Sequence, residues 1–381
     1  MMLSYWEQQS FIRYHYAVVG GGLVGLSTAL TIKELHPKAS VVVFEQGILP
    51  KGASTKNAGF ACFGSLSELL NDINTIGEHA TKQLVRDRWL GLQMLRKRIG
   101  DRGLGYESNG GYELLMESDL KYLDHMDRVN QLLIPIFKQP VFSENKQLVE
   151  RFSFNPNRAA TIISNPFEGQ LHTGTMMRSL ITLAARKGIN LVTGAKVESF
   201  EQSTKDIHLK VSSASSEPLV FRVKKLAVCT NAFARQLLPS LEINPGRGLV
   251  LVTRPIKHLK IKGTFHYDQG YYYFRNVASR VLFGGGRNLD IQGETTDAFG
   301  INQRIMDHLI AELSEMIIPD QPFEVDHQWS GIMAFGQDKR PLVNLHSPGI
   351  GYAVRLGGMG VALGSLVGDR LARILCLPEN A

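Results

Sequence analysis

Short apolar runs and helix-like segments alternate over the first fifty residues of the chain. Apolar runs occupy positions 16–19 and 41–44, and a segment with helical character at 26–35 lies between them. Runs of this length are typical of strands buried in a parallel sheet, and a helix that joins two such strands forms a βαβ unit. The pattern therefore predicts a strand, a helix and a second parallel strand at the start of the chain.

Strand-like and helix-like patterns of apolar residues continue along the rest of the chain. Helices are predicted where apolar positions recur about every 3.6 residues, at 66–99, 119–133 (with Ser118 as its cap), 175–187, 300–318 and 361–375. Strands are predicted at 110–116, 190–197, 207–211, 219–223, 225–232, 249–253, 270–274 and 281–283. The strands at 207–211 and 219–223 are expected to form a hairpin, and the last three an antiparallel sheet. These elements predict an α/β fold.

The turn after the first apolar run has the sequence GxGxxG, from Gly20 to Gly25. Gly20 permits a tight turn, Gly22 lets the backbone approach a pyrophosphate, and Gly25 lets the helix pack closely on the strand. The free N–H groups at the start of the helix, around Leu23 and Val24, favour a phosphate group. An ordinary glycine turn is the alternative, because such turns are common.

An acidic residue stands at the distance that a dinucleotide site requires. Glu45 ends the second apolar run, twenty positions after Gly25, and Gln46 follows it. The carboxylate of Glu45 is expected to accept hydrogen bonds from an adenosine ribose. The strand before the glycines, the helix after them and this acid agree, so the sequence favours a dinucleotide site over an ordinary turn.

A second loop of small residues lies at 52–59. Ser54, Lys56 and Asn57 offer hydrogen-bond donors, and Ala58 and Gly59 let the backbone lie against a ligand. The alternative is a plain loop before a helix N-cap. A simple NAD-binding unit has no need of a second contact loop, whereas a longer dinucleotide that carries a flavin does.

Two later segments bring small residues to the end of a strand or the start of a helix. The strand at 225–232 ends in small polar residues that include Thr230 and Asn231, as a strand facing a nucleotide needs, although a routine turn has the same appearance. The glycine-rich turn at 357–360 opens the helix at 361–375. A positive helix end suits the negative charge near N1 and O2 of a reduced flavin; the alternative is a helix merely packed closely on a strand.

Composition changes this picture little. The chain has 381 residues, 44% of them hydrophobic and 20% charged, as in a soluble globular enzyme of two domains. No apolar run approaches the roughly 18 residues of a membrane span, and the first fifteen residues do not form a signal peptide.

The three cysteines are far apart and show no metal-binding spacing, so we expect a cytoplasmic protein without a metal. The net charge of +7 fits RNA or a membrane surface, but a solvated surface with basic groups around an anionic cofactor is the preferred interpretation.

With these residues the chain resembles the D-amino acid oxidase (DAO) superfamily of FAD-dependent oxidoreductases, in particular its glycine/sarcosine oxidase and γ-glutamylputrescine oxidase-like branch. The resemblance runs from Ser4-Tyr5-Trp6-Glu7 through the glycine fingerprint and the 52–59 loop to Cys229-Thr230-Asn231-Ala232, and then from 329–341 to the closing glycine turn. It implies a discontinuous, Rossmann-like FAD-binding domain of the GR2 type at residues 12–75, 156–240 and 325–381. A second, α+β substrate domain built on an antiparallel sheet would comprise residues 76–155 and 241–324.

The resemblance and the motifs together give one set of expected contacts to FAD. The predicted cofactor-binding residues are Gly20, Gly22, Leu23, Val24, Gly25, Glu45, Gln46, Ser54, Lys56, Asn57, Ala58, Gly59, Val197, Thr230, Asn231, Gly331, Gly357, Gly358, Met359, Gly360 and Val361. The histidine and cysteine positions that some relatives use for covalent attachment are not evident, so non-covalent FAD is expected.

Three departures from the family pattern concern the substrate and the oxidant. Met333 stands where glycine oxidase-like members carry an arginine for the substrate carboxylate, and Ala362 where sarcosine oxidase-like members carry a carboxylate-binding lysine. Leu282 aligns near the lysine that those enzymes use for reaction with oxygen. A simple α-amino acid is therefore less favoured, although Arg287, Arg340 or Arg355 can bind a carboxylate from another direction.

The resemblance implies an FAD-dependent amine or amino-acid oxidase or dehydrogenase. A small-molecule amine or amino acid would pass a hydride to flavin N5 once its nitrogen is uncharged, the imine would hydrolyse, and O2 or another acceptor would take the electrons. The candidate catalytic residues are Tyr271, Tyr273, Arg287 and Arg355. The aromatic strand that carries the tyrosines forms either a substrate wall or cross-strand packing, and His172 is either a base or a structural histidine.

Two other functions stay open at this point. A hydroxy-acid or polyol-phosphate dehydrogenase of the same superfamily would pass electrons to a quinone. A flavin-containing tRNA-modification module would fit the basic charge, although the sequence offers no base-stacking motif, so no nucleic acid is expected. The sequence does not specify the substrate, the acceptor or the oligomeric state.

Overall fold

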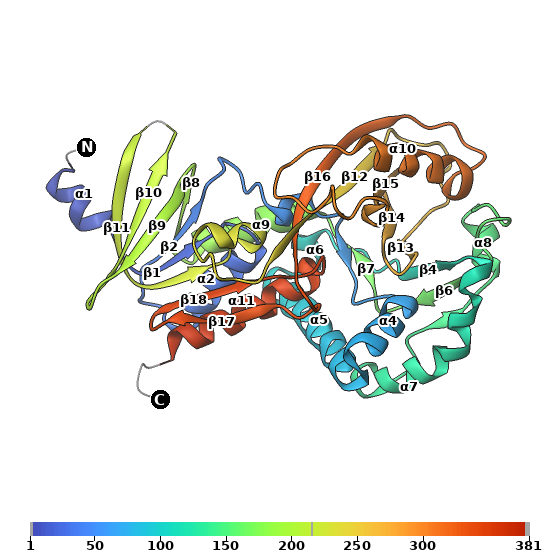
Figure 1. Ribbon diagram of the computed structural model, residues 1–381, viewed down its shortest axis with the longest axis horizontal. Coiled ribbons are helices and arrows are strands. Elements are labelled where there is room, and N and C mark those ends of the chain that lie inside the picture. Colours follow the sequence, from blue (N-terminus) through green and yellow to red (C-terminus); the bar gives the residue numbers. More distant parts are fainter. Residues whose placement is uncertain (1–2, 215, 378–381) are drawn as a thin grey trace.

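Two large sheets lie next to each other along the long axis of the molecule (Figure 1). The structure is a computed structural model that describes residues 3–214 and 216–377. One sheet carries the predicted βαβ unit, and the other carries the predicted antiparallel strands. The α/β prediction is therefore confirmed.

The first sheet has a parallel centre. Its strands β11, β1, β2 and β8 are parallel neighbours, and β18 is parallel to β11. Antiparallel strands β17, β10 and β9 extend it, and the predicted hairpin is confirmed as β10 with β11. The strands are β1 (Arg13–Val19), β2 (Val41–Glu45), β8 (Ile189–Thr193), β9 (Lys196–Gln202), β10 (Ile207–Ser213), β11 (Ser216–Val228), β17 (Leu342–Ser347) and β18 (Ile350–Val354).

The second sheet is antiparallel except where β13 runs parallel to β4. Its order is β16-β12-β15-β14-β13-β4-β6-β5. The strands are β4 (Gly111–Leu115), β5 (Ser143–Glu144), β6 (Thr161–Asn165), β12 (Asn244–Thr253), β13 (Thr264–Tyr267), β14 (Tyr272–Val277), β15 (Arg280–Gly285) and β16 (Val325–Phe335). A short antiparallel pair, β3 (Phe60–Ala61) with β7 (Gly169–Gln170), lies apart from both sheets in the hydrogen-bond pattern. The predicted domain boundaries assign β6 and β16 to the FAD-binding domain, whereas both strands pair in the second sheet. A division of the chain by sheets therefore differs from these boundaries at the two strands, and the boundaries stay a proposal.

Helices lie against both sheets, and α5, α6 and α9 lie near the middle of the molecule (Figure 1). The α-helices are α1 (Tyr5–Ser10), α2 (Leu23–Leu35), α3 (Ala53–Lys56), α4 (Leu66–Ile76), α5 (Glu78–Ile99), α6 (Asp101–Leu104), α7 (Met126–Phe137), α8 (Gln147–Arg151), α9 (Thr173–Arg186), α10 (Gln303–Glu312) and α11 (Gly360–Cys376). Short 3-10 helices occupy Glu117–His125, Asn231–Gln236 and Arg287–Leu289, and one π-helical turn occupies Leu313–Ile317. In the described part of the chain, no helix is long and apolar enough to cross a membrane.

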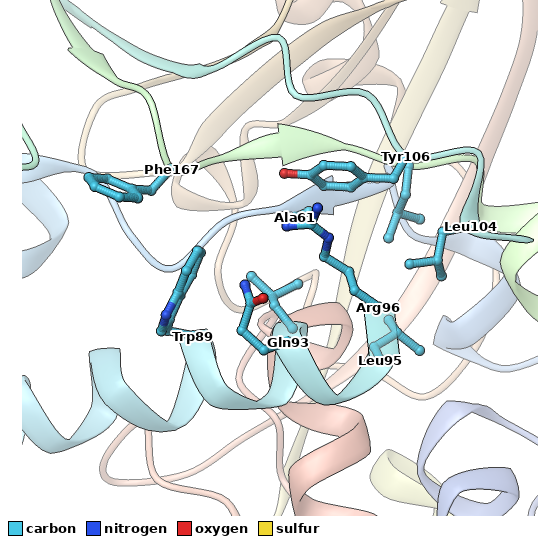
Figure 2. Close-up of a pocket in the computed structure, with 10 residues that line it drawn as sticks. Ala61, Trp89, Gln93, Leu95, Arg96, Leu104, Tyr106 and Phe167 are labelled. Atoms are coloured by element: carbon cyan, nitrogen blue, oxygen red, sulfur yellow. The ribbon is translucent and has the colours of Figure 1, made fainter. Parts of the chain in front are cut away.

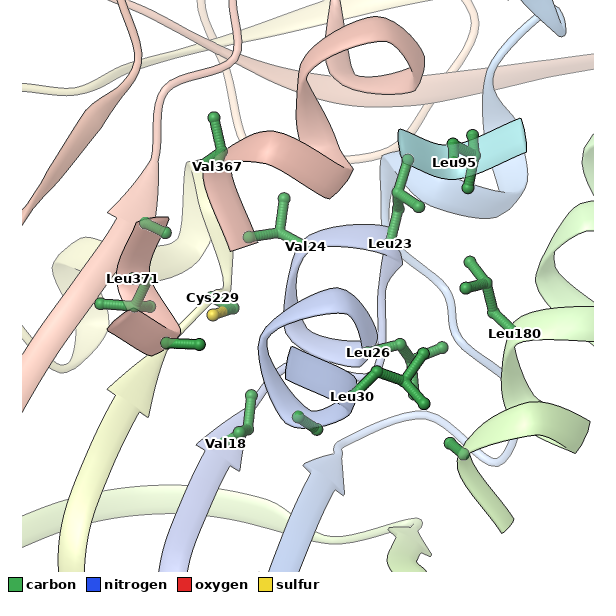
Figure 3. Close-up of a cluster of buried hydrophobic side chains, with 14 of the residues drawn as sticks. Val18, Leu23, Val24, Leu26, Leu30, Leu95, Leu180, Cys229, Val367 and Leu371 are labelled. Atoms are coloured by element: carbon green, nitrogen blue, oxygen red, sulfur yellow. The ribbon is translucent and has the colours of Figure 1, made fainter. Parts of the chain in front are cut away.

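The largest core joins the first sheet to helices from distant parts of the sequence, among them α2, α5, α9 and α11. Figure 3 shows Leu23, Val24 and Leu26 of α2 packed between Val367 and Leu371 of α11 and other apolar side chains. Two glycines of α11 let the helices approach, because a Cβ at position 364 or 368 would lie within 3 Å of α2. The start of α2, the helix that follows the glycine fingerprint, is thus fixed by α11, the last described helix of the chain.

Several predicted elements have other bounds in the structure, each for a local reason. The predicted helix at 66–99 breaks at Gly77, whose φ of +81° ends α4 before α5 begins. The predicted strand at 190–197 is likewise divided by Gly194 into β8 and β9.

The segment predicted as one helix at 119–133 is helical but divided, and the prediction of Ser118 as its cap is wrong. A 3-10 helix at Glu117–His125 precedes α7, and the carboxylate of Asp119 accepts the N–H of Met116 at 3.2 Å instead. The helix predicted at 300–318 begins at Gln303 and ends in the π-helical turn.

Candidate active site

A cavity of about 750 Å³ opens between the two sheets. The glycine fingerprint, the 52–59 loop and the turn before α11 line it on one side, and residues of β12, β13, β14 and β16 line it on the other. A cavity of this size holds a large organic ligand. One continuous space therefore joins the predicted nucleotide site to the second sheet.

The glycine fingerprint has the geometry that its sequence predicts. Gly20 has a φ of +109°, and a Cβ there would lie 2.7 Å from the carbonyl oxygen of Cys229. A Cβ at Gly22 would lie 2.7 Å from Ser54 Oγ, and one at Gly25 would overlap the carbonyl oxygen of Gly20. Gly25 thus serves close packing of α2 on β1 and lies outside the cavity lining, whereas Gly20 and Gly22 line the cavity.

The loop at 52–59 is held rigidly against the fingerprint. Ser54 Oγ accepts the N–H of Leu23 at 2.9 Å. Asn57 Nδ2 donates to the Ser54 carbonyl at 2.9 Å, and Asn57 Oδ1 accepts the N–H of Gly59 at 2.9 Å. Trp329 Nε1 donates to the Lys56 carbonyl at 2.9 Å. These bonds fix the backbone of the loop along the cavity wall.

Glu45 lies at the end of β2, where a ribose acceptor is expected. Its two carboxylate oxygens accept the N–H groups of Gly21 at 3.1 Å and Gly47 at 2.9 Å. Each oxygen has a second lone pair, so the carboxylate can also accept a hydroxyl hydrogen bond. Because the side chain is only 7% exposed, its position is fixed.

The closing turn brings a third group of backbone atoms to the cavity. Gly357 and Gly358 have φ values of +54° and +82°, and the Gly357 N–H donates to the carbonyl of Ala334 at 3.0 Å. Helix α11 begins at Gly360, and its N-terminal end lines the cavity. A positive helix end therefore faces this space.

The structure brings nearly all of the predicted cofactor-binding residues to this one cavity. Those that line it are Gly20, Gly22, Leu23, Val24, Glu45, Gln46, Ser54, Lys56, Asn57, Ala58, Gly59, Val197, Thr230, Asn231, Gly331, Gly357, Gly358, Met359, Gly360 and Val361. Their roles toward a ligand stay predictions.

The predicted catalytic residues separate into two groups. Tyr271, Tyr273 and Arg287 line the cavity. Arg355 lies outside the lining, where its guanidinium donates to Asp338 Oδ1 at 2.9 Å and to the carbonyl of Arg340 at 3.0 Å. Its geometry is that of a residue that holds the loop at 336–340, not of a residue that contacts a substrate.

A row of side chains across the second sheet faces the cavity, formed by Val250, Tyr273 and His266. Neighbouring strands place these residues in register, with Gly284 between Val250 and Tyr273. Phe60 contacts the rings of both Tyr273, at 5.6 Å, and His266, at 5.1 Å, edge to face. Burial raises the pKa of Tyr273 to about 12, so its hydroxyl stays protonated.

The opposite face of the same strands is ordinary core. Tyr272 stacks on Tyr267 at 4.7 Å, and Phe274 stacks on Phe265 at 4.8 Å. The aromatic strand is therefore both a cavity wall and cross-strand packing, on alternate residues.

Arg287 is a basic group at the substrate side of the cavity. Its guanidinium lies 4.5 Å from the ring centre of Phe335, and Nη2 donates to Thr295 Oγ1 at 3.3 Å. Nε is buried and has no hydrogen-bond partner among the described residues. Burial lowers the pKa of the guanidinium, an effect that Tyr271 and Glu294 oppose. The side chain is thus available to an anionic group.

Sequence reasoning missed the polar end of the cavity. Glu68 and Asp72 of α4, His266 of β13 and Lys339 also line it, and Lys339 forms an ion pair with Asp72. In the sequence the two acids look like the solvated face of a helix, and β13 is too short to show a strand pattern. Only the packing of α4 against the second sheet places these residues in the cavity.

One further histidine, His172, and one further arginine, Arg275, have structural roles. His172, the possible base, caps α9, because its Nδ1 accepts the N–H of Thr175 at 3.1 Å. Arg275 reaches from β14 to the carbonyls of Ala58 and Leu171, the latter at 3.1 Å. This arginine fastens the second sheet to the loop at 52–59.

A small pocket of about 10 Å³ lies below the strand pair β3–β7 (Figure 2). Trp89, Gln93 and Arg96 of α5 point into it, and the Arg96 guanidinium lies 4.2 Å from the ring centre of Tyr106. Its volume suits one water molecule at most. The pocket is therefore part of the packing and not a ligand site.

The residues around the large cavity fit FAD. The cavity reaches backbone atoms at both the fingerprint and the closing turn, where a long ligand can form hydrogen bonds. Gly22 of the fingerprint and Gly59 of the 52–59 loop both line it, and a Cβ at either position would clash with a neighbour.

Comparison with known proteins finds relatives that are similar over almost the whole length of this chain. A curated relative, the probable oxidoreductase OrdL of Haemophilus influenzae, is 21% identical over 378 residues, which cover 94% of this chain and 82% of the relative. The crystal structure of glycine oxidase from Geobacillus kaustophilus is 20% identical with a TM-score of 0.76, over 97% of this chain and 96% of that one. L-Proline dehydrogenase from P. horikoshii is 16% identical with a TM-score of 0.76, over 96% and 94% of the two chains. Iminodiacetate oxidase from Chelativorans sp. BNC1 is 18% identical with a TM-score of 0.73, over 96% and 97%.

These similarities confirm the predicted fold over almost the whole chain. The model of the family described as FAD dependent oxidoreductase (DAO) matches residues 15–374. The protein therefore belongs to the DAO family of FAD-dependent oxidoreductases.

Proposed function

We propose that the protein oxidises a C–N bond of an amine or amino acid with non-covalently bound FAD. The observation that carries this proposal is the single cavity that runs from the glycine fingerprint to the face of the second sheet with Tyr273 and Arg287. When bound, FAD accepts the hydride that leaves the substrate carbon. The imine that remains on the substrate is then hydrolysed.

The chain's own residues would hold the cofactor at three places. The fingerprint with Ser54 would bind the pyrophosphate, Glu45 the ribose, and the start of α11 the flavin ring at N1 and O2. Lys56, Asn57 and Met333 stand where a covalent link would need a histidine or cysteine, which supports non-covalent binding.

The second sheet would position the substrate. The row with Tyr273 excludes water from one wall, and Arg287 offers a guanidinium to a carboxylate. The named activities of the structural neighbours, glycine oxidase, L-proline dehydrogenase and iminodiacetate oxidase, support an amino compound as substrate. The cysteine pattern supports a cytoplasmic location, and a small molecule is the expected partner.

The test is anaerobic mixing of the yellow holoprotein with a panel of primary amines, secondary amines and amino acids. We expect at least one of them to bleach the flavin absorbance and to release an aldehyde, a ketone or an oxo acid. If the whole amine panel leaves the flavin oxidised while a hydroxy acid or polyol phosphate bleaches it, the C–N proposal is wrong. Comparing O2 with quinone and dye acceptors in the second half of the cycle then identifies the oxidant.

A further inference from the structure

His266 is a buried imidazole that the packing leaves without polar partners. Its side chain lies on β13, is 5% exposed and lines the large cavity. Neither Nδ1 nor Nε2 has a hydrogen-bond partner among the described residues. Burying such a group is unfavourable unless something else supplies the hydrogen bonds, so a ligand in the cavity is the natural partner.

The charged groups around His266 favour one kind of ligand. Glu68 of α4 interacts electrostatically with the imidazole, and its Oε2 accepts the N–H of Ser65 at 2.9 Å. No hydrogen bond to Glu68 Oε1 occurs within the described residues, and Glu68 lines the same cavity as His266. The carboxylate packs closely against Gly270, where a Cβ would lie 2.6 Å from Oε1. A free carboxylate oxygen and a free imidazole nitrogen in one cavity suit a hydrogen-bond donor that carries positive charge, such as an ammonium group.

The remaining titratable groups near His266 come from three other elements. Glu113 of β4 and Tyr273 of β14 are its register partners, and Lys339 lies beyond Glu68 and Asp72. The Glu113 carboxylate is occupied by the hydroxyl groups of Ser65 and Ser67. Tyr273 stays protonated because burial raises its pKa. Glu68 is thus the anion that acts on the imidazole.

The protonation states agree with the geometry. Burial lowers the pKa of His266, and the charge of Glu68 opposes this effect only in part, so the imidazole is neutral near pH 7 and can accept a proton. Burial raises the pKa of Glu68, but Lys339, the Ser65 amide and Arg88 oppose this effect and the pKa lies below its ordinary value, so Glu68 is an anion.

We propose that His266 binds the ammonium group of the amine substrate and accepts its proton before the neighbouring carbon is oxidised, with Glu68 stabilising the imidazolium that results. The N–H bond of the ammonium breaks, the proton bonds to the free ring nitrogen, and the substrate nitrogen keeps the electron pair. The proposal rests on the proposed amine oxidation. It assigns the base that His172 does not provide.

The test compares wild type with His266→Gln, Glu68→Gln and the control His172→Asn. An asparagine keeps the N-cap of α9, and position 172 lies outside the cavity lining. The rate of anaerobic flavin reduction is measured from pH 5 to 10 with two amine substrates of different basicity. The acid limb of the pH–rate profile is the part in which the rate falls as pH falls. If an enzyme group causes this limb, it lies at the same pH for both substrates. If the ionisation of the substrate causes it, the limb moves with the substrate's own pKa.

We expect wild type and H172N to lose activity as pH falls through the pKa of His266, at the same pH for both substrates. H266Q should lack that limb and reduce the flavin roughly 10²-fold more slowly or worse. In E68Q the limb should move to lower pH, because the anion that favours the imidazolium is gone. NMR titration of labelled histidines in the oxidised holoprotein should show the same shift in the His266 signal, independently of turnover.

Each outcome decides between the two proposals. If an amine reduces the flavin and H266Q retains the acid limb and the wild-type rate, His266 does not accept the proton and this inference is overturned, while the amine oxidation stands. If no amine reduces wild-type flavin, both fail together. If H266Q does not retain FAD, the E68Q limb and the NMR titration decide, and an unmoved His266 pKa in E68Q contradicts the inference.

Discussion

Ser54 Oγ accepts the backbone N–H of Leu23 at 2.9 Å and so joins the second glycine-rich loop to the first turn of α2. The same oxygen lies 2.7 Å from the point that a Cβ of residue 22 would occupy. The absence of a side chain at Gly22 therefore serves this contact as well as a bound pyrophosphate. A second substitution, at Ser54, can separate the two requirements.

Gly22→Ala should destabilise the protein on the order of 1–3 kcal/mol and abolish the retention of FAD, because the new methyl group overlaps Ser54 Oγ. Thermal unfolding and the ratio of flavin to protein absorbance measure the two effects. In the double variant with Ser54→Ala, the nearest remaining Ser54 atom would be at 3.5 Å, an ordinary contact. The double variant should regain stability but not FAD; full FAD occupancy in G22A would refute the assignment of the pyrophosphate site.

Tyr273 and Tyr272 form a matched pair on opposite faces of β14. Tyr273 lines the cavity, whereas Tyr272 stacks on Tyr267 in the second core. Loss of one hydrogen-bonding hydroxyl is worth about 0.5–1.5 kcal/mol. Tyr273→Phe should therefore lower kcat/KM roughly two- to tenfold, and Tyr272→Phe should leave it unchanged. Equal effects of both changes would show that the cavity face of β14 does not contact the substrate.

Arg287 should bind substrates that carry a carboxylate. Replacing it with methionine should raise KM for such substrates roughly ten- to hundredfold, because a charge-assisted hydrogen bond is lost. Amines without a carboxylate should be affected far less. Arg304→Met removes a positive charge from exposed α10 and serves as the control. An unchanged KM for carboxylate substrates in R287M would place the substrate anion elsewhere.

Arg355 and Arg340 share the carboxylate of Asp338 but differ in burial. The Arg355 side chain is 9% exposed and that of Arg340 is 69% exposed. Arg355→Ala should therefore lower the free energy of unfolding by about 1–3 kcal/mol, and Arg340→Ala by less than about 1 kcal/mol. Denaturant titration of both variants checks this order. If R355A keeps wild-type stability but raises KM, the arginine binds substrate after all.

Stability should fall as pH rises from about 5 to 8, because of a buried acid. Burial raises the pKa of Glu168 to about 8, an effect that the amides of Phe63 and Gly64 only partly offset. The folded protein therefore holds this proton more tightly than the unfolded chain, and the stabilisation is present at low pH and lost as pH rises through the folded pKa. Each pKa unit corresponds to about 1.4 kcal/mol.

The variant Glu168→Gln cannot release this proton, so its melting temperature should change less between pH 5 and 9 than that of wild type. Glu150→Gln, at an exposed position of α8, is the control and should keep the wild-type dependence. An identical pH dependence in E168Q and wild type would show that Glu168 titrates normally in the folded protein.

The parts of the fold that the sequence predicts are those fixed by neighbours along the chain. The first βαβ unit follows from apolar runs, and the glycines follow from turns that need them, such as Gly20 with its positive φ. The cofactor side of the cavity could be predicted for this reason. Even Gly25, which lies outside the lining, has the packing role that its position in the motif predicts.

The substrate side depends on contacts between distant residues, and these are not visible in local patterns. His266 belongs to a strand of four residues, and Glu68 looks like a surface position of a helix until α4 packs under the second sheet. Arg355 was expected at the site because its charge suits a carboxylate. Its actual partner, Asp338, is fixed by the fold and not by spacing.

The packing of α11 on α2 has a consequence for how the holoprotein is made. The start of α2 and the closing turn before α11 lie on the same cavity, although one is near the beginning of the chain and the other near the end of the described residues. A chain in which α11 has not yet packed on α2 lacks one wall of the flavin pocket. The full FAD site therefore forms only when these two helices, far apart in the sequence, have met.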